Sequence, residues 1–183
     1  SHTSNHSMKY IKVYAPATIA NFGAGFDIFG CALEKPGDLI EAKITNSNTL
    51  KITDITGDNG KLSKDPNKNT ATIAASHVLK SLNTNQGIEF KIHKQMPLGS
   101  GLGSSGASAA GGAVAANLLT GNKLNQEELV IAATKAEETV SGFHSDNVGA
   151  SILGGFILVR SYKPFEIIKL PTPKNLICIV TNP

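Results

Sequence analysis

The stretch Met96-Pro-Leu-Gly-Ser-Gly-Leu-Gly-Ser-Ser-Gly-Ala107 decides the fold of this 183-residue chain. Four glycines and three serines lie between Gly99 and Gly106. Residues 87–94 before the stretch alternate between polar and apolar side chains, as a strand does, and residues 107–119 after it are alanine-rich, as in a buried helix. A glycine-rich turn between a strand and a helix exposes free backbone N–H groups at the positive end of the helix dipole. The sequence therefore predicts an anion site, with phosphate as the obvious anion.

The composition indicates a folded protein and does not favour a nucleic-acid surface, a disulfide framework, a cysteine metal site or a membrane span. Hydrophobic residues make up 40% and charged residues 17%, which is enough to build a core. The net charge is +3 and the lysines are scattered, so a nucleic-acid surface is not favoured. The two cysteines, Cys31 and Cys178, have no CxxC or metal-type spacing, which fits a reducing, cytoplasmic compartment. No apolar run reaches the ~18 residues of a membrane span.

The two ends of the chain differ from its middle. Residues 1–7 are polar and precede Met8, so we interpret them as an expression scar and give His2 and His6 no metal role. A strand signal at residues 176–180 stands close to the end of the chain. Because a domain rarely ends on a core strand, we expect the chain to be a fragment.

The hydrophobic periodicity predicts strands first, then helices, then strands again. Pro16 is expected to end the first strand, a loop is expected over 17–27, and a turn over 35–38. Asn69 or Thr70 can cap the first helix, and Asn125 with Glu128 forms something close to a capping box. The predicted strands are 8–15, 28–33, 39–45, 50–55, 87–94, 156–160, 165–170 and 176–180; the predicted helices are 70–82, 107–119, 125–140 and a short one within 144–153. This order favours an α+β fold over regular βαβ units.

Four interpretations of the glycine-rich stretch compete. A flexible linker has the right composition, but a tightly patterned apolar helix would not follow it. Gly101, Gly103 and Gly106 match a dinucleotide fingerprint, yet Pro97 separates them from the strand and no second strand or acidic residue follows. A Walker loop is excluded because no Lys-Ser/Thr pair follows the glycines. The fourth interpretation is a phosphate loop without lysine, in which serines and backbone amides bind the phosphates.

Residues 97–107 closely resemble the PxxxGLGSSAA phosphate loop of the GHMP kinases, with Gly106 where alanine is usual. Residues 16–27 are similar to the PAxxANxGxGFD stretch of the homoserine kinases, one branch of that family. Residues 141–148, with the Gly154–Gly155 pair beyond them, resemble the SGxxHxDNVAP…GG stretch of the same branch. This last segment is one residue short, and Gly-Ala stands where Ala-Pro is usual. The resemblance covers residues 8–183.

The resemblance implies a fold and a reaction. The expected fold is α+β, like ribosomal protein S5 domain 2, as in the N-terminal domain of GHMP kinases, with their C-terminal domain absent. Residues 8–183 would be this nucleotide-binding domain, part of a longer two-domain kinase. The implied activity is ATP-dependent phosphorylation of L-homoserine to O-phospho-L-homoserine, a step towards threonine, with ATP and Mg²⁺. The chain alone is expected to turn over weakly or not at all.

The resemblance also implies site residues. Ser105 and Glu137 would bind Mg²⁺, with Glu138 as the neighbouring alternative. Asn147, together with Glu137 and Ser105, would take part in catalysis. The implied nucleotide-binding residues are Asn69 and the loop Pro97, Leu98, Gly99, Ser100, Gly101, Leu102, Gly103, Ser104, Ser105, Gly106 and Ala107. The implied substrate-binding residues are Asn21, Asp27, His144 and Asn147.

Plainer interpretations of these residues stay open. Asn69 serves equally well as an ordinary helix cap, and Asn21, Asp27 and Asn147 as turn residues. No general base is evident, so we expect catalysis by positioning and charge stabilisation, with Asp27 taking the substrate ammonium and Asn147 orienting the hydroxyl.

Two functions other than phosphorylation of L-homoserine stay open. One is another GHMP small-molecule kinase, acting on mevalonate, a sugar or a diphosphocytidyl polyol. The other is a non-enzymatic S5-like binding module, since this fold also occurs in RNA-binding proteins. The polar residues of the 16–27 and 141–148 stretches suit a small zwitterion and favour L-homoserine. We expect no nucleic-acid or membrane partner, and a homodimer stays open.

Overall fold

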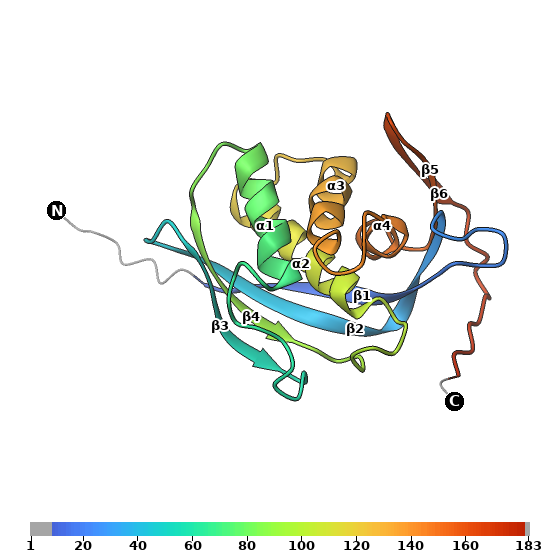
Figure 1. Ribbon diagram of the computed structural model, residues 1–183, viewed down its shortest axis with the longest axis horizontal. Coiled ribbons are helices and arrows are strands. Elements are labelled where there is room, and N and C mark those ends of the chain that lie inside the picture. Colours follow the sequence, from blue (N-terminus) through green and yellow to red (C-terminus); the bar gives the residue numbers. More distant parts are fainter. Residues whose placement is uncertain (1–8, 182–183) are drawn as a thin grey trace.

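The computed structural model describes residues 9–181 as a sheet with four helices packed on one of its faces (Figure 1). The elements are β1 (Ile11–Ala20), β2 (Phe29–Thr45), β3 (Leu50–Thr56), α1 (Thr70–Ser81), β4 (Gly87–His93), α2 (Ser104–Leu119), α3 (Gln126–Glu137), α4 (Asp146–Leu153), β5 (Phe156–Tyr162) and β6 (Phe165–Leu170). The expected expression scar at residues 1–7 and the expected strand start at Met8 lie outside the described residues.

The sheet is built around the long strand β2. The strand order is β3-β4-β2-β5-β6, with β1 pairing β2 as well. β2 runs antiparallel to β1, β4 and β5, whereas β3 lies parallel to β4. Since the helices come between β3 and β5 in sequence and gather on one face of a mixed sheet, the predicted α+β class is confirmed.

Small residues let α2 pack close to its neighbours, and this packing fixes the position of the helix in the fold. A Cβ at Gly112 would lie 2.0 Å from the Ala71 carbonyl oxygen, and one at Gly111 would lie 2.5 Å from the Ile40 side chain. α2 therefore packs against α1 and the sheet at a distance that larger residues would not allow. Phe90 and Ile40 are fully buried beneath it. The core thus holds the first turn of α2 in one place.

Two expectations for the first strands are wrong. β1 does not end at Pro16 but continues to Ala20, and a register shift between Pro16 and Thr18 accommodates the proline, which has no N–H to donate. The expected turn at 35–38 lies inside the continuous strand β2, where Gly37 and Asp38 pair with β1. In both places β1 and β2 pair with each other, and the residues on either strand alone favour a turn because their sequence does not show this pairing.

The expected strand at 176–180 is also wrong, because residues 171–181 form no strand. Ile177 and Ile179 are 83% and 85% exposed. An apolar, strand-forming sequence needs a sheet edge to pair with, and within residues 9–181 this segment joins no ladder. Over the same described range, no helix combines the length and apolar character required to cross a membrane.

Candidate active site

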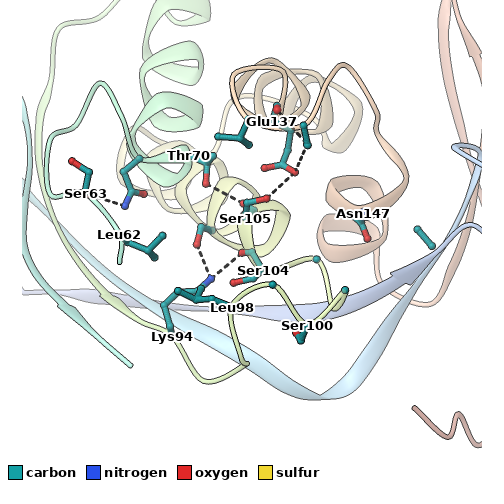
Figure 2. Close-up of a pocket in the computed structure, with 18 of the residues that line it drawn as sticks. Leu62, Ser63, Thr70, Lys94, Leu98, Ser100, Ser104, Ser105, Glu137 and Asn147 are labelled. Carbon is teal, nitrogen blue, oxygen red and sulfur yellow. Dashed lines mark hydrogen bonds between the residues drawn. The ribbon is translucent and has the colours of Figure 1, made fainter. Parts of the chain in front are cut away.

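A cavity of about 520 Å³ lies where the glycine-rich loop meets the first turn of α2 (Figure 2). Its walls come from this loop, from the segment before α1, from the end of α3 and from the first turn of α4. The sequence-predicted residues that line it are Asn21, Asn69, Leu98, Gly99, Ser100, Gly101, Gly103, Ser104, Ser105, Glu137 and Asn147. The predicted residues that do not line it are Asp27, Pro97, Leu102, Gly106, Ala107, Glu138 and His144. The structure therefore brings most of the predicted nucleotide and metal residues together.

The loop owes its shape to left-handed glycines. Gly99, Gly101 and Gly103 have φ values of 70°, 75° and 68°, which residues with side chains adopt at a cost. Gly103 is the N-cap of α2 and has no side chain to bond the first-turn N–H groups, and no acidic residue stands in that turn. The N-terminus of α2 thus keeps free N–H groups and its positive dipole end beside the cavity, as an anion site requires.

Glu137 and Ser105 lie next to each other in the wall of this cavity. Ser105 Oγ donates to Glu137 Oε2 at 3.1 Å, and Ser141 Oγ donates to the same oxygen at 3.4 Å. Burial raises the pKa of the Glu137 carboxyl, and the two hydroxyl donors oppose that shift. Glu138 is exposed, so of the two adjacent glutamates only Glu137 reaches the cavity.

Two buried polar atoms in this wall have no hydrogen-bond partner. They are Ser104 Oγ and Glu137 Oε1, the only such side-chain atoms within residues 9–181. Buried polar groups are nearly always paired, so an unpaired hydroxyl and an unpaired carboxylate oxygen at one cavity indicate a bound group that completes them. The chemistry of the set, hydroxyl and carboxylate oxygens beside a helix N-terminus, suits a phosphate with a hard cation.

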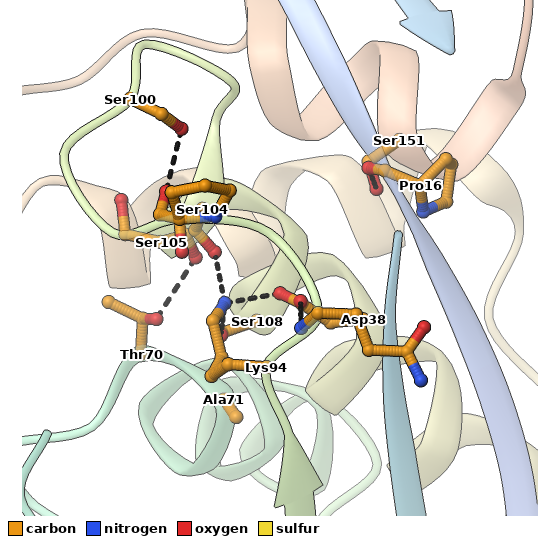
Figure 3. A network of polar contacts seen from close by, with 12 residues as sticks. Pro16, Asp38, Thr70, Ala71, Lys94, Ser100, Ser104, Ser105, Ser108 and Ser151 are labelled. Carbon is orange, nitrogen blue, oxygen red and sulfur yellow. Dashed lines mark hydrogen bonds and ion pairs between the residues drawn. The ribbon is translucent and has the colours of Figure 1, made fainter. Parts of the chain in front are cut away.

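Lys94 and Asp38 form a buried ion pair behind the loop, which the sequence analysis missed (Figure 3). Lys94 Nζ donates to Asp38 Oδ2, to the Ser104 carbonyl oxygen at 2.9 Å and to Ser108 Oγ at 2.9 Å. Burial lowers the pKa of Lys94, and the Asp38 carboxylate opposes that shift. Lys94 continues the inward positions of β4 after Ile88, Phe90 and Ile92, and this period-two pattern could have revealed it.

The predicted substrate residues fall into two places. Asn21 Oδ1 accepts the N–H of Asp27 at 2.8 Å, and His144 Nδ1 lies 3.6 Å from Asp27 Oδ2. The side chains of His144 and Asp27 are 44% and 36% exposed, so they stand outside the cavity rather than within it. Asn147 lines the cavity, and its Oδ1 accepts a hydrogen bond from Thr18 Oγ1 at 2.7 Å. The 16–27 and 141–148 stretches therefore converge in the structure, as expected.

Asn69 caps α1, as one of the two interpretations expected. Its Oδ1 accepts the N–H of Ala71 at 3.1 Å, and its Nδ2 donates to the Ser63 carbonyl oxygen at 3.0 Å. The side chain is buried and also lines the cavity. The cap thus fixes the cavity wall opposite the end of α3.

Comparisons with known proteins agree with this geometry. Residues 69–155 match the model of the GHMP kinases N terminal domain. The chain is 41% identical over 187 residues to a homoserine kinase of Chlorobium phaeobacteroides strain BS1, and 43% identical over 179 residues to one of Arabidopsis thaliana. These matches cover 96% and 94% of this chain but 58% and 48% of the relatives, so the chain spans about half of their length.

Solved structures support the same family. A crystal structure of homoserine kinase from Cytophaga hutchinsonii superposes with a TM-score of 0.86 at 45% identity, over 96% of this chain and 56% of that one. The Methanococcus jannaschii mevalonate kinase shares the fold, with a TM-score of 0.68 at 18% identity over 91% of this chain and 57% of that one. With the sequence, the fold and the loop in agreement, the chain belongs to the GHMP kinases and has the fold of their N-terminal domain.

Proposed function

We propose that the whole protein transfers the γ-phosphoryl group of ATP to the hydroxyl of L-homoserine, forming O-phospho-L-homoserine and ADP. The observation that carries the proposal is the pair of unpartnered atoms, Ser104 Oγ and Glu137 Oε1, at a cavity that also contains the free N-terminus of α2. The curated relatives at about 40% identity are named homoserine kinases, which supports the choice of acceptor. The reaction would be a cytoplasmic step towards threonine.

The triphosphate would bind at the first turn of α2. The N–H groups after Gly103 and the unpaired Ser104 hydroxyl offer donors to phosphate oxygens. The base would lie on the side of the cavity formed by Leu62, Ser63 and Asn69. The helix cap fixes the orientation of the Asn69 amide, and because one Nδ2 hydrogen bonds the Ser63 carbonyl oxygen, the other N–H is left for the nucleotide.

Magnesium fits the residues that are present. Ser105 and Glu137 would hold it, and Glu137 Oε1 is one of the two buried oxygens that lack a partner. Magnesium keeps several waters and is usually bound by one or two carboxylates together with substrate phosphates. Within residues 9–181 no group of three His, Cys, Asp or Glu side chains is placed to hold a metal. When bound, magnesium neutralises charge on the phosphates and so favours phosphoryl transfer.

The acceptor would lie between the phosphate loop and the 21–27 and 141–147 segments. Asp27 would bind the ammonium group, and the half-exposed His144 lies beside it, with Nδ1 3.6 Å from Asp27 Oδ2. Asn147 would orient the hydroxyl against the γ-phosphoryl group. As an amide it takes no proton, so the hydroxyl proton would leave late, to the transferred phosphoryl group, and the protein would act by positioning and charge stabilisation.

A substrate panel tests this proposal. ADP release by the whole protein is measured with L-homoserine, mevalonate and galactose as acceptors. We expect kcat/KM for L-homoserine to exceed the others by at least about 100-fold, because polar groups built for one ligand reject analogues that leave them unpaired. Glu137→Gln should lower kcat by about 100-fold or more, while the exposed Glu138→Gln stays within about twofold. Preference for another acceptor, or equal losses in the two variants, would contradict the proposal.

A further inference from the structure

Thr18 connects two parts of the candidate active site, the phosphate loop and the first turn of α4. It lies on β1 and is fully buried. Its N–H donates to the Leu102 carbonyl oxygen of the phosphate loop at 2.9 Å, and its hydroxyl donates to Asn147 Oδ1 of α4 at 2.7 Å. A Cβ at Gly103 would come within 2.2 Å of the same hydroxyl oxygen. Thr18 thus ties the phosphate loop to the residue proposed to orient the acceptor.

The hydroxyl of Thr18 can be satisfied in only one way. A buried hydroxyl proton needs an acceptor, and within residues 9–181 the one acceptor it has is Asn147 Oδ1. If the Asn147 amide were rotated, its NH₂ group would donate to Thr18 and the Thr18 proton would be buried without a partner, which is costly. The buried hydroxyl therefore selects one of the two amide orientations.

The selected orientation decides what Asn147 offers to the cavity. Its carbonyl oxygen is occupied by Thr18, and within the described chain its Nδ2 group has no hydrogen-bond partner. Asn147 is half-buried in the cavity wall. The amide group left for a ligand is consequently the NH₂ group, a donor.

We infer that Thr18 is a positioning residue that holds the Asn147 amide with its NH₂ group, not its carbonyl oxygen, towards the reacting groups. This inference rests on the proposed function. A donor in that place hydrogen-bonds an oxygen lone pair of the acceptor hydroxyl or of the γ-phosphoryl group, where negative charge accumulates during transfer. A carbonyl oxygen in the same place would repel the phosphoryl oxygens. The buried Thr18 hydroxyl on β1 thereby determines that Asn147 presents a hydrogen-bond donor, not an acceptor, to the reacting groups.

Kinetics of two variants of the whole protein test the inference. Thr18→Val has nearly the same shape without the hydroxyl, and Thr18→Ser keeps it. We expect Thr18→Val to lower kcat by about tenfold or more with KM for ATP within about twofold, because the amide loses its orientation while the nucleotide site is kept. Thr18→Ser should retain kcat within about threefold. An undiminished kcat in Thr18→Val, or an equal loss in Thr18→Ser, would overturn the inference.

A spectroscopic measurement separates this inference from the proposed function. The side-chain NH₂ resonances of Asn147 are recorded in the ¹⁵N-labelled 183-residue chain. They should move in Thr18→Val and stay in Thr18→Ser, whichever acceptor the whole protein uses. If the wild type fails to phosphorylate L-homoserine but these shifts are seen, the proposed function fails and the positioning role stands. If the resonances do not move in Thr18→Val, the positioning role fails even with an active wild type.

A third variant decides the matter if Thr18→Val does not fold. Asn147→Asp keeps an oxygen for Thr18 but places a second carboxylate oxygen where the NH₂ group stood. We expect kcat to fall by at least about 100-fold, since a donor becomes a charged acceptor beside the phosphoryl group. Activity equal to that of the wild type would show that no donor is needed there and would refute the inference.

Discussion

Removing the ammonium of Lys94 should destabilise the protein more than almost any other single polar change. The side chains of Lys94 and Asp38 are both 0% exposed, so Lys94→Met leaves the Asp38 carboxylate buried, with the N–H of Gln95 as its remaining donor. Breaking a buried ion pair by removing one partner costs about 3–5 kcal/mol. The Ser104 carbonyl oxygen at the first turn of α2 also loses a donor. Domains of this kind have a free energy of unfolding of about 5–15 kcal/mol, so the loss is a large fraction of the total.

Urea unfolding followed by far-UV circular dichroism measures this cost. With a denaturant slope of about 2 kcal/mol per molar, the Lys94→Met midpoint should fall by about 2 M. The exposed Lys123→Met is the matched control and should change the free energy of unfolding by less than about 0.5 kcal/mol. The double variant Lys94→Met with Asp38→Asn should be more stable than Lys94→Met alone, because no buried charge remains. A Lys94→Met cost no larger than that of the control would refute this reasoning.

Four further predictions follow from the burial of Glu137 and from single contacts of Gly112 and Asn69. Burial raises the pKa of Glu137, and magnesium needs the ionised carboxylate. The affinity for magnesium with an ATP analogue, measured by calorimetry, should therefore fall as pH is lowered through that raised pKa. Glu137→Gln should lose this pH dependence. Without nucleotide the same group should add stability as pH falls, since the folded state binds the proton more tightly than the unfolded state; other carboxyls titrate in the same range, so the wild-type profile is compared with that of Glu137→Gln, and a flat difference would contradict the raised pKa. Gly112→Ala should cost about 1–3 kcal/mol in urea unfolding because its Cβ would meet the Ala71 carbonyl, and a neutral result would mean that α1 and α2 are not so closely packed. Asn69→Ala should cost about 1 kcal/mol more than Asn69→Ser, because both lose the bond to the Ser63 carbonyl oxygen but serine keeps an oxygen that can cap α1; equal thermal unfolding of the two would argue against capping.

Local patterns were sufficient where the physical cause is local. The period-two pattern of β4, the cap at Asn69 and the box formed by Asn125 and Glu128 all depend on neighbours within a few residues, and each is confirmed. The glycine-rich loop was also predictable, since three of its glycines have the positive φ values that such a turn requires.

The errors arose where a distant segment decides the structure. Pro16 sits inside a strand because β2 pairs around it, and residues 176–180 form no strand because no sheet edge meets them. Lys94 and Asp38 are 56 positions apart, and no pattern in one segment identifies the other as its partner. The same holds for Thr18 and Asn147, which are 129 positions apart.

The candidate site was predictable in part. The resemblance named Glu137 beside Glu138, and only the burial of Glu137 and its bond to Ser105 distinguish them. Asp27 and His144 were expected together and lie 3.6 Å apart, although outside the cavity. Their roles towards a substrate stay predictions.

The most direct test of the central claim is a titration of the ¹⁵N-labelled chain with magnesium and a non-hydrolysable ATP analogue, followed through backbone amide resonances. If the cavity at the N-terminus of α2 holds a magnesium-bound triphosphate, the amides of residues 101–107 should shift most, with those around Asn69 and Glu137 next. Shifts confined to the helix-free face of the sheet, around Lys43 and Lys91, or no shifts at millimolar nucleotide, would contradict it.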